Sequence, residues 1–415
     1  MDLIETKQKA DRALLISVDT GKFDAEASLN ELWELCESAG AEPVLTVLQK
    51  LDKVESATFV GSGKLIEIKE NCESYDIDLI IADSELSPTQ IKTLERECGV
   101  RVIDRTTLIL DIFALRAKSK EGKLQVELAQ LKYLLPRLTG KGVELSRLGG
   151  GIGTRGPGET KLETDRRHIH RRMETLKDQL KDVENHRQRL RERRDKDGVI
   201  TVAIVGYTNV GKSTLLNALT DAGVLAEDKL FATLDITSRA IELPDGRSVM
   251  LIDTVGLIRR LPHDLVEAFK STLEEAAAAD VILNVQDLSS PERAQQAEVT
   301  AKLLDELGCG DIPKINVLNK SDAALEPDTV FEDDSTVMIS ALHHGGFDKL
   351  LEMIARKLPE TARRMKLLVP YDKTSFIGRI RLEGKIFSEE YTVDGTLVDA
   401  LIDQKLICEA KKYTY

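Results

Sequence analysis

The sequence of 415 residues has no long hydrophobic run, and this absence excludes an integral membrane protein. A membrane-spanning helix needs roughly 18 or more consecutive apolar residues, and no such stretch occurs. The segment from Met1 to Lys7 also lacks the apolar core of a secretory signal peptide. We therefore expect a cytoplasmic protein, either free in solution or peripheral to a membrane.

Cysteine is scarce, and its spacing excludes two further classes. The five cysteines are far apart and form no C-x-x-C pair; they are Cys36, Cys72, Cys98, Cys309 and Cys408. Disulfide-stapled domains and structural zinc sites need closely spaced cysteines, so neither is predicted. The thiols are expected to be reduced.

Basic residues are fewer than acidic ones, and the net charge is −13. This balance argues against indiscriminate nucleic-acid binding but leaves room for a local basic surface on an acidic body. The 42% hydrophobic and 31% charged content is that of a globular protein. A chain of this length predicts two to four domains, and we expect a monomer.

One glycine-rich loop follows an apolar strand pattern, Val199 to Val205, and precedes a helical pattern that begins at Leu215. A G-x-x-x-x-G-K-S loop between a strand and a helix cradles phosphates with backbone N–H groups and the helix dipole. Lys212 is predicted to neutralise the β- and γ-phosphates, and Ser213 to bind Mg²⁺. A plain glycine turn is the alternative. The predicted phosphate-binding residues are Gly206, Tyr207, Thr208, Asn209, Val210, Gly211, Lys212, Ser213 and Thr214.

The remaining parts of a guanine-nucleotide switch follow in order. Asp253 is predicted to hold Mg²⁺ through water, and the Gly256 N–H to sense the γ-phosphate. Thr233 is the expected second hydroxyl on Mg²⁺, so Lys212, Thr233 and Gly256 are the candidate catalytic residues. The nucleotide-binding prediction in these two switch segments covers Phe231, Ala232, Thr233, Asp253, Thr254, Val255 and Gly256.

Two later motifs predict guanine as the base. The Asp322 carboxylate can accept two hydrogen bonds from guanine, a pair of donors that adenine does not offer. Backbone N–H groups of a second segment are expected to close over the base. The predicted base-binding residues are Asn319, Lys320, Asp322, Ser340, Ala341 and Leu342.

Two residues bear on the rate of hydrolysis. Leu257 stands where Ras-like enzymes have the Gln that orients the attacking water, so slow intrinsic turnover is predicted. Asn209 has two interpretations: its oxygen helps a monovalent cation such as K⁺ to sit against the phosphates, or it only braces the loop.

Strand and helix patterns alternate over the first hundred residues and predict a small, mostly parallel α/β sheet. The expected strands are 12–18, 43–48, 78–82 and 100–103, and the expected helices are 28–38, 63–73 and 87–98. The loop from Val60 to Lys64 is either a strand-to-helix turn or a nucleotide or RNA contact.

Two long helical patterns, 108–138 and Thr160 to about Lys196, predict an antiparallel hairpin with a narrow apolar seam. The loop between them, 149–160, is rich in glycine and leads into a capping box formed by Thr160 and Glu163. It is either a flexible linker or an RNA-phosphate contact. The candidate RNA-binding residues are Arg147, Gly151, Gly153, Arg155, Gly156, Gly158 and Lys161.

We therefore predict a multidomain α/β protein with four parts. The parts are an N-terminal α/β domain (1–115), a helical hairpin (116–197), a P-loop GTPase domain (198–360) and a small C-terminal α+β domain (361–415).

Several stretches resemble the HflX family of translation-factor-like GTPases. The stretches are Arg101 to Thr106, Glu121 to Leu131, Gly149 to Arg167 and Leu261 to Val266. The resemblance implies a GTPase that binds the large ribosomal subunit and its RNA, and that splits or rescues stalled ribosomes under heat or antibiotic stress. It also implies ATP hydrolysis by some members, which would give the loop near Lys64 a second role.

The leading prediction is thus a GTP-hydrolysing, ribosome-stimulated switch with Mg²⁺. A regulatory GTPase that acts on protein effectors is one alternative, and an NTP-dependent RNA remodeller is another. The basic glycine loop argues against the first, and guanine selection by Asp322 argues against the second.

Overall fold

The computed structural model describes residues 10–138, 157–196, 198–220, 230–231, 237–260, 275–324, 333–359 and 362–414. The chain divides into two compact units. The first unit consists of Met1–Arg187, Glu227–Asp235 and Val255–Thr272, and the second of Gln188–Ala226, Ile236–Thr254 and Leu273–Tyr415. Phe231 and the described residues from Val255 to Arg260 therefore cluster with the N-terminal residues.

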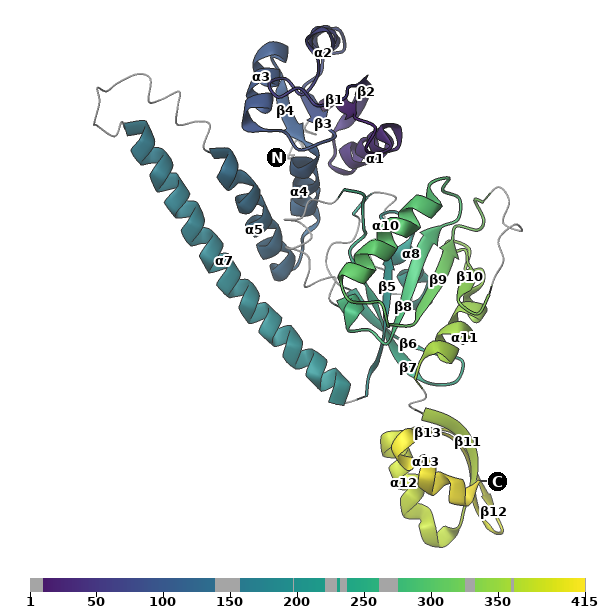
Figure 1. Ribbon diagram of the computed structural model, residues 1–415. Coiled ribbons are helices and arrows are strands. Elements are labelled where there is room, and N and C mark those ends of the chain that lie inside the picture. The colour runs from purple at the N-terminus through teal and green to yellow at the C-terminus, as the bar shows by residue number, and fades with distance from the viewer. Residues whose placement is uncertain are drawn as a thin grey trace, which may run out of the picture. The chain divides into compact units, whose positions relative to one another are not determined.

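The N-terminal sheet is parallel, with the strand order β2-β1-β3-β4, which confirms the predicted fold class (Figure 1). Its strands are β1 (Arg12–Asp19), β2 (Glu42–Lys50), β3 (Leu79–Ala82) and β4 (Arg101–Asp104). Its helices are α1 (Ala25–Ser38), α2 (Ser62–Ser74), α3 (Pro88–Cys98) and α4 (Arg105–Arg116). Side chains cap three of these helices at Asp24, Ser87 and Asp104.

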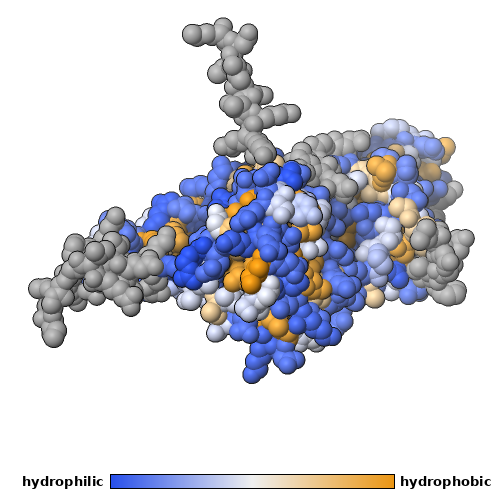
Figure 2. All heavy atoms as spheres, turned by 90° about the horizontal axis from the view of Figure 1, so that it is seen from above, coloured by the Kyte–Doolittle hydropathy of each residue, from blue (hydrophilic) through white to orange (hydrophobic). Residues whose placement is uncertain are grey.

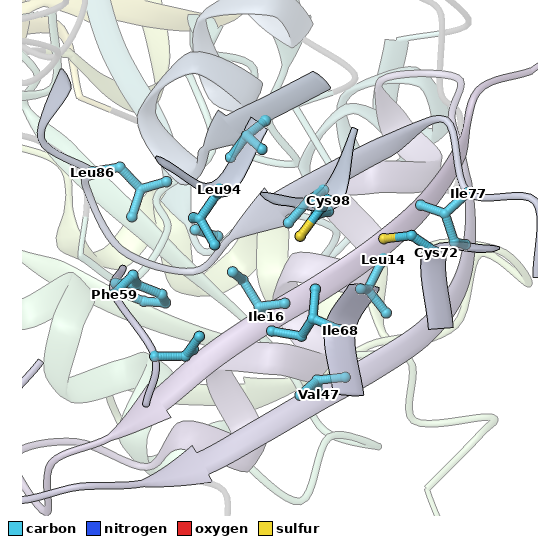
Figure 3. Close-up of a cluster of buried hydrophobic side chains, with 14 of the residues drawn as sticks. Leu14, Ile16, Val47, Phe59, Ile68, Cys72, Ile77, Leu86, Leu94 and Cys98 are labelled. Atoms are coloured by element: carbon cyan, nitrogen blue, oxygen red, sulfur yellow. The ribbon is translucent and has the colours of Figure 1, made fainter. Parts of the chain in front are cut away.

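Side chains alternate between the two faces of this sheet. On one face, Leu14 and Ile16 of β1 pack with Ile68 of α2 and Leu94 of α3 (Figure 3). The opposite face receives α1 and α4, which contact β1 and β3 respectively. Both faces are buried, which explains the nearly continuous apolar runs of β1 and β3.

The helical pattern predicted as one element over 108–138 is two helices. The first, α4, begins at Arg105 because the Asp104 side chain accepts a hydrogen bond from the Thr107 N–H at 3.0 Å. It ends where Ala117 adopts an extended conformation. The second, α5 (Lys120–Arg137), begins after Ser119, whose side chain caps it at the Gly122 N–H. The prediction of a single helix was wrong because the apolar spacing continues across a break made by a local cap.

Helix α5 pairs with α7 (Pro157–Lys196) in the expected antiparallel hairpin. Leu124 and Leu128 of α5 pack against Met173 and Leu176 of α7. Glu121 of α5 pairs with Arg187 of α7, and Glu127 pairs with Arg172. The later residue of α5 thus pairs with the earlier residue of α7, as in antiparallel helices.

The start of α7 differs from the prediction. The helix begins at Pro157 rather than Thr160, so Thr160 lies inside the helix and the predicted capping box was wrong. Proline is favoured in the first turn of a helix because its fixed φ suits the helix and its missing N–H has no partner there.

The second unit contains a six-stranded sheet with the order β10-β9-β8-β5-β7-β6, in which only β6 is antiparallel. The strands are β5 (Ile200–Gly206), β6 (Thr237–Glu242), β7 (Ser248–Asp253), β8 (Val281–Asp287), β9 (Lys314–Asn319) and β10 (Thr336–Met338). The helices are α8 (Lys212–Thr220), α10 (Arg293–Glu306) and α11 (Phe347–Lys357). The antiparallel strand β6 was not predicted.

The C-terminal residues form a small α+β fold, as predicted, and its sheet is antiparallel with the order β11-β13-β12. Its elements are β11 (Ala362–Val369), α12 (Thr374–Glu383), β12 (Lys385–Thr392), β13 (Gly395–Asp403) and α13 (Gln404–Ala410). Phe376 and Ile380 of α12 pack against Val398 and Ile402 of β13.

On the face drawn in Figure 2, hydrophobic residues form small separate patches in a mostly hydrophilic surface. In the part of the chain that the structure describes, no helix has the length and apolar character needed to span a membrane.

Candidate nucleotide-binding site

The glycine loop connects the fully buried strand β5 to α8, as the P-loop prediction requires. Lys212 opens the helix, and its ammonium group donates hydrogen bonds to the carbonyls of Gly206 at 3.2 Å and Tyr207 at 2.7 Å. The side chain is thus held across the loop. Burial lowers the pKa of Lys212 to about 8, an effect that nearby Asp253 partly opposes. A buried cation held in this way favours an anionic ligand.

Two residues of the loop have left-handed backbone conformations that make it a concave turn. Gly211 has φ +91°, and a Cβ there would lie 2.3 Å from Nδ2 of Asn319. Asn209 has φ 60°, a conformation that Asn tolerates better than most residues. Position 211 therefore requires glycine for both its conformation and its close contact.

Ser213 and Asp253 form the part of the site that suits Mg²⁺. The Ser213 hydroxyl donates to Oδ2 of Asp253 at 2.7 Å, and burial raises the pKa of this carboxyl. Among the described residues, Oδ1 of Asp253 is one of the buried side-chain atoms that have no hydrogen-bond partner. A buried carboxylate oxygen and a neighbouring hydroxyl are the hard oxygen ligands that Mg²⁺ prefers, so the residues fit this ion.

Asn319, at the end of β9, joins the phosphate loop to the predicted base-binding segment. Its Nδ2 donates to the carbonyl of Val210 at 2.8 Å, and its Oδ1 accepts from the Ala341 N–H at 2.9 Å. The side chain is 2% exposed. The structure therefore brings these two motifs together through one buried amide.

Asp322 lies beside the same segment. Its carboxylate accepts a hydrogen bond from the Ser340 hydroxyl at 2.5 Å, and this bond holds the pKa of Asp322 below its ordinary value. The carboxylate stays ionised at neutral pH, as an acceptor for the guanine N1–H and 2-amino group must be.

One residue of the site was not predicted. Asp287, at the end of β8, pairs with the Lys320 ammonium group at 2.7 Å. The register of the sheet places Asp287 opposite Asn319. Its position at the carboxyl end of a strand next to β9 was the available signal, because ligand-binding residues gather at that edge of a parallel sheet.

Other predicted residues lie elsewhere in the fold, have exposed side chains or fall outside the described part of the chain. Ala232, Thr233 and the glycine-loop residues Arg147 to Gly156 lie outside the described residues. Gly158 and Lys161 belong to the first turns of α7. Phe231 is buried, and its ring packs edge-on against Phe113. Leu342 is 69% exposed.

Comparisons with known proteins agree with this geometry. Three family models match: a GTP-binding GTPase N-terminal region over residues 26–114, a GTP-binding GTPase middle region over 116–194, and a 50S ribosome-binding GTPase over 201–320. The chain is 50% identical over 408 residues to the GTPase HflX of Caldanaerobacter subterraneus subsp. tengcongensis, covering 98% of this chain and 94% of that protein. The chain belongs to the HflX family of GTPases. It is therefore an enzyme that hydrolyses GTP.

Other members of the HflX family and one solved structure are also similar. The GTPase HflX of Escherichia coli strain K12 is 39% identical over 408 residues, covering 96% of each chain. The crystal structure of a GTP-binding protein from Sulfolobus solfataricus in complex with GDP is 26% identical, with a TM-score of 0.45, and covers 84% of this chain and 98% of that one.

Proposed function

We propose that this GTPase binds the large ribosomal subunit in its GTP-bound form and separates or rescues stalled ribosomes. The observation that carries the proposal is the match of residues 201–320 to the family described as 50S ribosome-binding GTPases, on a chain of the HflX family. Lys212, Ser213 and Asp253 would hold the phosphates and Mg²⁺, with Thr233 and Gly256 as the parts that respond to the γ-phosphate. Bound Mg²⁺ would neutralise the charge that develops on the phosphates.

The glycine loop at 149–160 is the proposed contact with ribosomal RNA. It joins α5 and α7, which are held together by an apolar seam and by the two Nη/Nε hydrogen bonds of Arg172 to Glu127, at 2.6 and 2.7 Å. Some arginines of α7 are thus used within the hairpin, so we assign RNA contact to Arg147 and Arg155, in and next to the glycine loop, and to Lys161 in the first turns of α7. The positive charge and hydrogen-bond donors of these side chains suit an RNA phosphate backbone.

Leu257 supports a ribosome-stimulated reaction. Its side chain is 3% exposed and has no group that could orient a water molecule. Slow turnover by the free protein follows, and the missing group would come from the partner or from a rearrangement. Asn209, already in a left-handed conformation, is the candidate for holding K⁺ against the phosphates.

Co-sedimentation with purified large subunits tests the proposal. The protein should sediment with the subunits in a non-hydrolysable GTP analogue and several-fold less in GDP, and subunits should accelerate GTP hydrolysis. Equal sedimentation in both nucleotides would refute the proposed switch.

A matched pair of variants tests the loop. Arg155→Ala should weaken binding to the subunits without changing GTP affinity, whereas Arg96→Ala, at a side chain that is 73% exposed on α3, should change neither. A loss of GTP affinity in Arg155→Ala would show that the loop serves the nucleotide instead.

A further inference from the structure

A buried aspartate in the N-terminal domain holds Arg260, and we extend the name second switch segment to residues 253–260 because Arg260 lies four residues after Gly256. Asp83 follows β3 and is fully buried. Its Oδ1 accepts from Nη1 of Arg105 at 2.8 Å, and its Oδ2 accepts from Nη1 of Arg260 at 3.1 Å and from the Ser17 hydroxyl at 3.3 Å. We call Asp83, Arg105 and Arg260 the aspartate cluster.

Arg260 is fixed by more than this carboxylate. Its guanidinium lies 4.1 Å from the ring centroid of Phe23, and it also donates to the hydroxyls of Ser28 at 3.2 Å and Ser84 at 2.9 Å. Its backbone is left-handed, with φ 52°. A strained backbone conformation persists where surrounding contacts determine it, and here four groups of the N-terminal domain contact Arg260: the Asp83 carboxylate, the Phe23 ring and the two serine hydroxyls.

The neighbouring residue is held as well. Nη2 of Arg105 donates to the Arg259 carbonyl at 3.4 Å and pairs with Glu31 of α1. Arg105 therefore contacts the switch backbone directly, while Arg260 contacts the N-terminal domain with its side chain. Two consecutive residues of the switch segment are thus fixed.

The first switch segment has an independent contact with the same domain. The Phe231 ring packs edge-on against Phe113 of α4, with the centroids 4.6 Å apart, and both rings are buried. The adjacent Leu230 N–H donates to the Ser38 hydroxyl at 2.9 Å. All these residues belong to one compact unit.

The distance along the chain links this anchor to the chemistry. Gly256, whose N–H is the expected sensor of the γ-phosphate, precedes Arg260 by four residues, which span at most about 14 Å. Leu257 and Ile258 between them are each 3% exposed, so this short connection is packed. Fixing Arg259 and Arg260 therefore restricts where the Gly256 N–H can lie.

We propose that Asp83 and Arg105 are positioning residues for GTP hydrolysis, because they fix the second switch segment through Arg260 and the Arg259 carbonyl. The N-terminal domain then acts on the switch as an effector within the same chain. A switch segment that is ordered beforehand loses less conformational entropy when it engages the γ-phosphate. The anchor should therefore favour steps that involve the γ-phosphate and leave GDP binding unchanged.

Arg260→Gln in the full-length chain tests this proposal without ribosomes. Its side chain is 32% exposed and Asp83 keeps Arg105, so the variant should fold. We expect kcat to fall about fivefold or more, with KM and the GDP dissociation constant within about twofold. Arg364→Gln, which breaks an exposed pair with Asp399 in the C-terminal domain, is the matched control and should match the parent.

Hydrogen exchange supplies a second measurement. Replacing GDP by a non-hydrolysable GTP analogue should change exchange in the segment from Leu79 to Arg116 of the parent protein. In Arg260→Gln this change should be lost, while exchange near Lys212 still responds to the nucleotide.

A double variant separates positioning from a purely structural role. The effects of Asp83→Asn and Arg260→Gln on kcat should be less than additive in the double variant, since both substitutions remove the Asp83–Arg260 interaction. An unchanged or raised kcat in Arg260→Gln, or equal losses of GTP and GDP affinity, would overturn the proposal. Because no ribosome is present, these outcomes are independent of the ribosome-binding proposal.

Discussion

Two buried aspartates stand at the carboxyl ends of parallel strands, one in each unit of this GTPase. Asp83 follows β3 and Asp253 ends β7, and both are fully buried. Arg105 and Arg260 donate to both oxygens of Asp83. Asp253 accepts from one hydroxyl, and its Oδ1 has no donor among the described residues.

This difference distinguishes Asp83, whose carboxylate stabilises the fold, from Asp253, whose carboxylate we propose binds a ligand. A buried charge costs stability unless charged donors compensate it. Asp83 is compensated by two guanidinium groups, those of Arg105 and Arg260. Asp253 is only partly compensated, and its raised pKa reflects that burial. The partly compensated aspartate is the one that we propose holds Mg²⁺.

The largest expected effect is a loss of GTP hydrolysis in the Asp253→Asn variant. The neutral amide removes the negative charge that Mg²⁺ requires, so Mg²⁺-dependent hydrolysis should fall by about a hundredfold or more. Thermal unfolding should be unchanged or shifted upward, because a poorly compensated buried charge has been removed. A lower melting temperature would show that Asp253 is structural after all.

Asp83→Asn should have the opposite profile for stability. It leaves the buried guanidinium of Arg105 without one of its carboxylates, at a cost of about 3 kcal/mol. The melting temperature measured by calorimetry should fall clearly, with GDP affinity per folded molecule retained. Similar melting temperatures for the two aspartate variants would erase the distinction between the sites.

The titration of Lys212 gives a pH-dependent test of the nucleotide site. Its folded-state pKa is about 8, against an ordinary 10.5, so the unfolded chain binds more protons between those values. Stability of the ligand-free protein should therefore rise with pH from about 8 to 10.5. Phosphate favours the charged lysine, so GDP affinity should fall over the same range, by at most about tenfold per pH unit.

Calorimetric titration of GDP between pH 7 and 10 measures this effect, with Lys212→Met as the reference. The variant should bind weakly with a flatter pH profile. A profile as steep as that of the parent would assign the proton to another group.

The smallest expected effect concerns an exposed carboxylate. Hydrogen bonds from Arg172 lower the pKa of Glu127, so the pair stabilises the hairpin above the ordinary glutamate pKa and is lost as pH falls through the lowered value. Glu127→Gln should lower the melting temperature at pH 7 only slightly, since exposed pairs contribute little. At a pH below the lowered pKa of Glu127, the variant and the parent should melt alike.

The sequence was sufficient where the signal is local. The P-loop lies between β5 and α8 as predicted, because the spacing from Gly206 to Ser213 and its apolar flanks specify the turn directly. Four parallel N-terminal strands also follow from their apolar runs. The break between α4 and α5 was missed because one serine cap at Ser119 outweighs continuous apolar spacing.

Long-range pairing could not be predicted. Asp83 and Arg260 are 177 positions apart, and nothing in the local pattern of either residue indicates the other. Asp287 and Lys320 meet only because β8 and β9 are neighbours. Such pairs depend on sheet order and on which helices cover each face, and a single sequence does not encode these in any short window.

The buried amide of Asn319 has a consequence for how the nucleotide is recognised. The same side chain braces the phosphate loop at Val210 and the base-binding segment at Ala341. We therefore expect contacts at the two ends of the nucleotide to be cooperative, because a fragment with only the phosphates, or only the base, would contact one of the two segments that Asn319 connects. Intact guanine nucleotides should bind more tightly than the summed binding free energies of their fragments predict. Recognition of the base would then also strengthen binding of the phosphates.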